Sequence, residues 1–290
     1  MSVVLTGPPA LAPLLARGAL LSPFKRPRPD TDFPRDRLVL PALRIDLARL
    51  AAYERVCGFA TGDDALPLTY PHVLGFPLAM RLMSEWGFPL PLLGLVHTSI
   101  EITRYRAPAV AGEYELAVHI GGLAPHRRGT EASVVTEVRG GEDVLWESTS
   151  TYLARHRTAG SPAERAEHTP LPAVAEWHLA GDVGRRYGTV SGDRNPIHMY
   201  PFTARLFGFP RPIAHGMWTV ARCLAAHRAP EAVRVRAEFR APVPLPGTVT
   251  YAADGHGRFE LRSGTGAHPL ERRGERGKVH VEGRVLPLAA

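Results

Sequence analysis

Apolar residues recur at helical spacing in two stretches of this chain, one in each half. The first stretch contains Phe76, Ala79, Met80 and Met83, and the second contains Met217, Val220, Ala221, Leu224 and Ala225. Residues three and four positions apart lie on the same face of a helix, so each stretch predicts a helix with an apolar face. Each half is therefore expected to contribute one helix to a buried core.

Alternating apolar and polar residues follow both predicted helices. The predicted strands are residues 96–106, 113–120, 131–138 and 144–153 in the first half, and residues 233–239, 248–251, 258–263 and 278–285 in the second. Such alternation is typical of strands with one buried face, and Gly and Pro at the joins predict turns. The pattern indicates an α+β protein in which each half is a helix followed by an antiparallel meander.

A short internal repeat relates the two halves. Residues 53–58 (YERVCG) resemble residues 187–192 (YGTVSG), and residues 105–108 (YRAP) resemble residues 239–242 (FRAP), with the same offset of 134 residues in both cases. An identical offset at two separate places indicates duplication of one unit.

The repeat predicts how the chain is divided. Residues 41–155 form the first copy and residues 176–290 form the second, with residues 156–175 as a polar linker that contains Gly and Pro. Residues 1–40 precede the first copy as an N-terminal arm. Its apolar stretch, residues 11–21, predicts either an extra helix or a mobile arm.

Composition narrows the class of protein. A chain of 290 residues, 44% of them hydrophobic, can form two small domains. The net charge of +7 suits an acidic carrier protein or the phosphates of coenzyme A. Nucleic acid is not expected, because no zinc-finger spacing, leucine zipper or strand motif of aromatic and basic residues accompanies the charge.

Two further features indicate where the protein works. No apolar run approaches the length needed to cross a bilayer, so no membrane span is expected. Cys57 and Cys223, the two cysteines, lie in contexts typical of small buried positions and not of a disulfide framework. We therefore predict a cytoplasmic protein.

The candidate chemistry lies in residues 187–198 (YGTVSGDRNPIH), where Asp193 and His198 are five positions apart. Gly192 permits a tight turn, and Pro196 fixes its own φ and disfavours helix at the residue before it. Taken singly, Gly-Asp and Asn-Pro are ordinary turn dipeptides. Together they hold a carboxylate and an imidazole, the groups that general acid–base catalysis uses, on one rigid turn.

Residues 187–198, followed by Ala204 and by residues 213–217 (IAHGM), resemble the signature of the MaoC-like enoyl-thioester hydratases and dehydratases. Further segments look like the double-hotdog dehydratases of actinobacteria: residues 67–71 (PLTYP), 97–98 (HT), 126–129 (HRRG) and 206–210 (LFGFP). The resemblance covers roughly residues 40–287. It implies a double hotdog, in which two antiparallel sheets each wrap around a central helix.

The resemblance also implies an activity. It points to a hydro-lyase of fatty-acid metabolism that interconverts (3R)-hydroxyacyl and trans-2-enoyl thioesters of coenzyme A or acyl carrier protein. Asp193 and His198 would be the acid–base pair, and the amide of Gly216, at the start of the second predicted helix, would stabilise the oxyanion. The chemistry requires no cofactor. No metal is expected, because Asp193, His198 and His215 match no familiar ligand spacing.

Four residues that flank Asp193, His198 and Gly216 are candidates for substrate contact: Ser191, Asn195, His215 and Met217. Asn195 either orients the turn or hydrogen-bonds a catalytic side chain, and a purely structural role is open as well. For His215 we favour capping of the buried helix start over lining of the site. Gly181, Gly184 and Gly188 lower the helix propensity of the segment before the motif.

The first copy lacks the candidate chemistry. At the repeat offset, Phe59 and Asp64 stand where the second copy has Asp193 and His198, and Thr61-Gly62 replaces the Asn-Pro turn. We therefore predict a catalytically inactive first copy. In the first copy His72 also lies 19 positions after Tyr53, whereas in the second His215 lies 28 positions after Tyr187, and the shorter connection could leave space for a long acyl chain.

Two other functions stay open at this point. A hotdog thioesterase would hydrolyse the same substrates without needing the Asn-Pro-Ile-His arrangement. A non-catalytic scaffold that binds acyl carriers or lipids would fit the degenerate first copy. Pairing of two hotdog units within one chain also removes the need for a homodimer without forbidding one.

Overall fold

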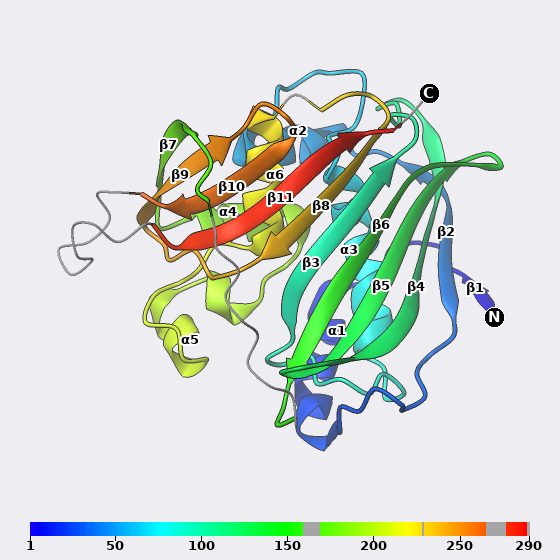
Figure 1. Ribbon diagram of the computed structural model, residues 1–290. Helices are drawn as coiled ribbons and strands as arrows, with labels where there is room; N and C mark the ends of the chain where they lie inside the picture. Colours follow the sequence, from blue (N-terminus) through cyan, green and yellow to red (C-terminus); the bar gives the residue numbers. More distant parts are fainter. Residues whose placement is uncertain (159–168, 228, 265–276, 289–290) are drawn as a thin grey trace. The chain divides into compact units, whose positions relative to one another are not determined.

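The computed structural model describes residues 1–158, 169–227, 229–264 and 277–288 (Figure 1). The chain divides into two compact units. The first consists of Met1–Ile45 and Pro71–His168, and the second of Asp46–Tyr70 and Thr169–Ala290. A segment of 25 residues from the first sequence copy, Asp46–Tyr70, is thus grouped with the second copy.

The first unit is an antiparallel sheet with a helix on one face. Its strands are β2 (Arg37–Arg44), β3 (Val96–Arg104), β4 (Glu113–His126), β5 (Gly129–Gly140) and β6 (Asp143–Arg155), in the order β2-β4-β5-β6-β3. Helix α3 (Tyr70–Met83) lies across the sheet (Figure 1). It approaches β5 so closely that a Cβ on Gly75 would lie 2.6 Å from Thr136 Cγ2.

The N-terminal arm packs as part of the first unit. Strand β1 (Ser2–Val4) pairs in parallel with β2 and is followed by α1 (Leu11–Leu21) and η1 (Ser22–Phe24). Lys25 Nζ donates hydrogen bonds to the carbonyl oxygens of Glu85 and Phe88, at 2.7 and 2.6 Å. The predicted extra helix is therefore confirmed, and the arm is tied to the loop that follows α3.

The second unit has the same plan. Strands β7 (Ala173–Leu179), β8 (Val233–Phe239), β9 (Gly247–Ala253), β10 (Arg258–Ser263) and β11 (Val279–Pro287) form an antiparallel sheet in the order β8-β11-β10-β9-β7. Helix α6 (Gly216–Ala226) lies against this sheet (Figure 1), with Val220, Ala221 and Cys223 fully buried.

Four further helical segments complete the second unit. They are α2 (Leu47–Cys57), α4 (Val183–Ser191), η2 (Pro196–His198) and α5 (Pro201–Leu206). Helices α2 and α4 correspond to each other in the repeat. Both end at a glycine in the left-handed conformation, Gly58 with φ of 80° and Gly192 with φ of 84°. The internal repeat is thus visible in the backbone as well as in the sequence.

All of the predicted strands and both predicted core helices are present, with bounds that differ by a few residues. The predicted meander order is wrong, because β3 pairs with β6 and β8 pairs with β11, and neither lies beside the strand that follows it in the chain. Strand β4 runs six residues further than predicted, through a bulge between Ile120 and Gly122. The low helix propensity of residues 181–188 was misleading, because α4 forms there. The predicted linker lies partly outside the described residues, which stop at 158 and resume at 169.

Two predictions from composition can be compared with the structure. Cys57 and Cys223 are both buried and free, as expected. Among the described residues, no helix is long and apolar enough to cross a membrane.

Candidate active site

The turn that carries Asp193 is held by hydrogen bonds from its own residues. Asp193 Oδ1 accepts from the amide of Asn195 at 3.1 Å, and the amide of Asp193 donates to Ser191 Oγ at 3.2 Å. Asn195 Oδ1 accepts from the amide of Ile197 at 3.4 Å and caps η2. Ser191 and Asn195 therefore shape the turn. Of the roles considered for Asn195, its contacts support orientation of the turn.

Two glycines of α4 let this turn lie directly against the helix backbone. A Cβ on Gly184 would lie 2.1 Å from the carbonyl oxygen of His198, and a Cβ on Gly188 would lie 2.9 Å from that of Asp193. A side chain at either position would push the turn outward. Gly184 and Gly188, two of the glycines that lower helix propensity, are therefore needed for packing of the turn that holds Asp193.

His198 is buried, and one of its ring nitrogens is already committed. Nδ1 lies 2.7 Å from the carbonyl oxygen of Ile213. A carbonyl oxygen only accepts hydrogen bonds, so Nδ1 carries the proton and Nε2 of the neutral ring keeps a lone pair. Ile213 is held in turn, since its own amide donates to the carbonyl of Ile197 at 3.1 Å. This arrangement leaves Nε2 as the basic nitrogen of His198.

His215 stands at the N-cap position of α6, but its side chain makes no cap hydrogen bond. The favoured capping interpretation is therefore wrong. Instead, Nε2 donates to the carbonyl oxygen of Asp193 at 2.9 Å, and the ring stacks on His198 with 3.7 Å between centroids. His215 Nδ1 is buried and has no hydrogen-bond partner in the described part of the chain. His215 thus lies beside Asp193 and His198.

Burial keeps both imidazoles neutral near pH 7. Desolvation, with a smaller contribution from His215, lowers the pKa of His198 to about 3, against the opposing effects of Asp193 and the Ile213 carbonyl. Desolvation also lowers the pKa of His215 to about 4. His198 and His215 are 8% and 2% exposed, whereas the Asp193 side chain is 30% exposed. The site therefore combines a partly exposed carboxylate with a neutral, buried imidazole base.

The start of α6 supplies the remaining candidates. Gly216 is its first residue, and a Cβ there would lie 2.8 Å from Phe239 Cε1, so a larger residue would collide with β8. The first amides of a helix have no acceptor within the helix, and the N-cap side chain, that of His215, makes no hydrogen bond to them. Met217 is buried in the same turn. The Gly216 amide is therefore among the N–H groups that the helix itself leaves available.

Asp193, His198 and His215 form one compact cluster. Their possible ligand atoms lie within 4.8 Å of one another. One nitrogen of each imidazole already donates to a carbonyl, so at most one nitrogen per ring could bind a metal. The expectation that the site uses no metal stays a prediction.

Helix α2, which the sequence analysis did not predict, supports the end of α4, next to the turn that holds Asp193. Arg49 Nε donates to the carbonyl of Val190 at 2.8 Å, and Nη2 donates to that of Ser191 at 3.4 Å. These are terminal carbonyls of α4, next to the turn that holds Asp193. Trp218 Nε1 on α6 donates to the carbonyl of Val56 at the end of α2, at 2.9 Å. No motif around Arg49 marks this role in the sequence.

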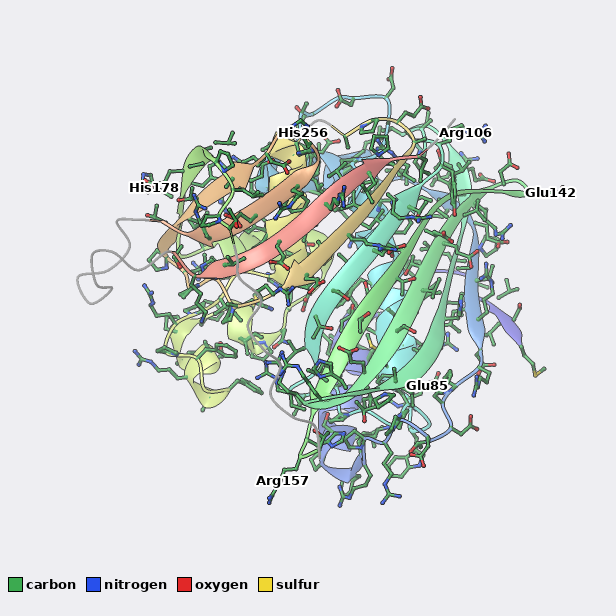
Figure 2. All side chains as sticks on the ribbon, viewed as in Figure 1. Glu85, Arg106, Glu142, Arg157, His178 and His256 are labelled. Atoms are coloured by element: carbon green, nitrogen blue, oxygen red, sulfur yellow. The ribbon has the colours of Figure 1, made fainter. Side chains whose placement is uncertain are left out.

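The positions equivalent to the candidate pair look different in the first copy. Phe59 stacks on Tyr53 with 6.3 Å between ring centroids, and Asp64 is exposed. Two other histidines of the second unit, His178 on β7 and His256 at the β9–β10 turn, are exposed and lie at the margin of the sheet (Figure 2). Neither these histidines nor Phe59 and Asp64 form a buried cluster of a carboxylate and imidazoles like that of Asp193, His198 and His215.

The chain is 40% identical over 264 residues to 3-hydroxyacyl-thioester dehydratase X of Mycobacterium tuberculosis, a match that covers 89% of this chain and 93% of that relative. The chain belongs to the MaoC-like dehydratase family. Residues 164–264, which include Asp193, His198 and the start of α6, match the model of the MaoC like domain.

Solved structures place this MaoC-like dehydratase in a known fold. The crystal structure of HtdX from Mycobacterium tuberculosis is 36% identical with a TM-score of 0.72, over 87% of this chain and 100% of that chain. A second Mycobacterium tuberculosis protein, described as having a double hotdog fold, is 15% identical with a TM-score of 0.51, over 84% of this chain and 92% of that chain. The predicted double hotdog is confirmed.

Proposed function

We propose that this MaoC-like dehydratase interconverts (3R)-hydroxyacyl thioesters and trans-2-enoyl thioesters, with Asp193 and His198 as its acid–base pair. The observation that carries the proposal is the hydrogen bond from His198 Nδ1 to the Ile213 carbonyl. It leaves Nε2 of a neutral imidazole as a base in the same cluster as a carboxylate. Membership of the dehydratase family, and the name of the 40% identical relative, support the thioester substrate.

The proposed reaction needs two proton transfers and no redox step. In dehydration, one group of the pair removes the proton from C2, and the pair passes that same proton to the hydroxyl leaving C3. Water is released, and a double bond forms between C2 and C3. The proton taken from C2 leaves in the water, so Asp193 ends as a carboxylate and His198 as a neutral imidazole, as they began. Their titration accordingly belongs to the pair.

Negative charge builds on the thioester oxygen when C2 loses its proton. We assign the stabilising hydrogen bond to the amide of Gly216, because the start of α6 offers uncapped N–H groups and positive potential. The absence of a Cβ at Gly216 would also let a substrate carbonyl approach closely.

His215 completes the proposed site. Its Nε2 fixes the main chain at Asp193, and its stacked ring shields one face of His198 from water. We further propose that the second copy alone is catalytic. The thioester carrier is coenzyme A or acyl carrier protein, and the activity belongs to fatty-acid metabolism.

The test follows the absorbance of the conjugated enoyl thioester. Wild-type protein should hydrate crotonyl-CoA or a longer trans-2-enoyl-CoA, seen as loss of absorbance without release of free thiol, and should yield the (3R) product. Asp193→Asn should lower kcat/KM by about 100-fold or more, the scale of general acid–base catalysis. Asp182→Asn is the matched control, because Asp182 lies at the start of α4 and pairs with Arg186 on the surface.

Two results would overturn the proposal. Release of thiol at the rate of absorbance loss would indicate a thioesterase. Full activity of a folded Asp193→Asn protein would exclude Asp193 from the acid–base pair.

A further inference from the structure

Large apolar side chains are exposed together on and beside α5. Tyr200, Phe202, Leu206 and Phe207 are 48%, 67%, 77% and 40% exposed, and we call these four residues the α5 patch. Phe202 and Leu206 are four positions apart and share one face of the helix. The rings of Tyr200 and Phe202 stack with 6.5 Å between centroids. Single exposed apolar residues are ordinary, whereas a contiguous group of them indicates a binding surface.

Positive charge surrounds the α5 patch. Arg194, Arg205 and Arg211 are all exposed, and the Arg185 guanidinium lies 5.2 Å from the centre of the Tyr200 ring. Residues 194–230 contain no Asp or Glu. Within the part of the chain that the structure describes, Arg194 and Arg205 form no ion pair. The rim of the patch therefore offers unneutralised guanidinium groups to an acidic partner.

The α5 patch is connected directly to the catalytic turn. Helix α5 begins three residues after His198, and Thr203 Oγ1 donates to the carbonyl of Pro196 at 2.7 Å. In Figure 1, α5 stands clear of the sheet formed by β8–β11. A ligand bound at the patch would thus sit next to the segment that holds the acid–base pair. The surface projects outward, unlike the concave sites that bind small molecules.

We propose that the α5 patch docks an acidic carrier protein that holds the acyl thioester substrate on a flexible arm. The inference rests on the proposed function, because it names the partner that would deliver the same thioester. An apolar centre with an arginine rim is the usual anatomy of a protein interface. Arginines without acidic neighbours complement the negative surface of such a carrier and would raise its rate of association. Coenzyme A lacks a protein surface and would not need the patch.

The experiment compares the same acyl group on two carriers. Three proteins are assayed: wild type, the double variant Phe202→Ser/Leu206→Ser, and Arg205→Glu. Each is given crotonyl-CoA and, separately, a crotonyl group on the phosphopantetheine thiol of purified bacterial acyl carrier protein. The controls are Val174→Ser, an exposed apolar position on β7, and Arg284→Glu, an exposed arginine on β11. We expect the two α5 variants to lose about tenfold in kcat/KM with the protein-bound substrate through KM, with coenzyme A kinetics and control variants unchanged.

Several outcomes would overturn the docking proposal. Equal losses on both carriers would mean that α5 affects the catalytic turn, and no loss on either would mean that the patch binds no carrier. Binding of wild type, but not of the α5 variants, to vesicles of equal phosphatidylcholine and phosphatidylglycerol, with unchanged carrier-protein kinetics, would assign the patch to a lipid surface. If wild type hydrates neither substrate, the proposed function itself has failed, which is a different result from failure of docking.

Discussion

Replacement of Gly184 by alanine tests how closely the turn that holds the proposed acid–base pair depends on α4. The added Cβ would lie 2.1 Å from the carbonyl oxygen of His198, 3.1 Å from its carbon and 3.4 Å from its Cβ. Close carbon–oxygen contacts in proteins are about 3.3 Å, so the backbone at His198 must move by about 1 Å. The atoms that block the Cβ are main chain, which cannot swing aside as the end of a side chain can.

In Gly184→Ala, helix propensity should raise the free energy of unfolding, whereas packing should lower it. In a solvated helix, alanine instead of glycine stabilises by about 1 kcal/mol. Overpacking at a buried contact costs about 1–3 kcal/mol, so Gly184→Ala should leave stability unchanged or lower it by up to about 2 kcal/mol. A displacement of about 1 Å at a catalytic group can cost about 100-fold in rate. Activity should therefore fall far more than stability.

The assay is hydration of crotonyl-CoA, together with urea unfolding of the same samples. Gly181→Ala is the matched control, because its Cβ would make an ordinary contact of 3.6 Å with Pro246 Cδ just before α4. We expect the control to retain wild-type activity and Gly184→Ala to lose it. The reasoning would be refuted if Gly184→Ala were as active as the control and more stable than wild type.

Two further predictions follow from the site. Arg49→Met should lower kcat about tenfold with little change in KM, because the terminal carbonyls of α4 would lose the guanidinium that orients the turn, and equal kcat in the variant would contradict this. The free energy of unfolding should fall as pH drops from 6.5 toward 4. The pKa of His198 is lowered to about 3 and those of His72 and His215 to about 4, so below 6.5 only the unfolded chain binds these protons. At pH 5 the loss is about 2 kcal/mol per histidine, and a urea midpoint no lower at pH 5.0 than at pH 7.5 would contradict it.

The strands after each core helix, and both core helices, were predictable because burial imposes a period on the sequence. The order of the strands was not, since the pairing of β3 with β6 and of β8 with β11 leaves no local pattern. Alternation along β5 and helical spacing along α6 each mark a buried face, which a single sequence displays directly. Helix α4 was hidden because Gly184 and Gly188 lower its local propensity. The reason for these glycines is the contact that they make with a turn later in the chain. Tertiary packing overrode propensity there.

The candidate site shows the same division. Asp193, His198 and Gly216 could be selected from a motif, because their chemistry and spacing are local. The hydrogen bond from His198 to the Ile213 carbonyl and the support from Arg49 could not, because main-chain acceptors leave no mark on the sequence, and the partners lie 15 and 141 residues apart. His215 was misjudged because its position at a helix start suggested a cap, whereas its ring turns toward Asp193.

The most direct test of the central claim compares two buried histidines, one from each copy. His198→Gln and His72→Gln would be assayed for hydration of crotonyl-CoA, at a temperature at which both proteins are folded by circular dichroism. Both residues have a pKa lowered by burial, but only His198 adjoins the Asp193 carboxylate. We predict that His198→Gln loses about 100-fold or more in kcat/KM and that His72→Gln retains activity close to wild type. Full activity of His198→Gln, or a larger loss in His72→Gln, would contradict the assignment of the chemistry to the second copy.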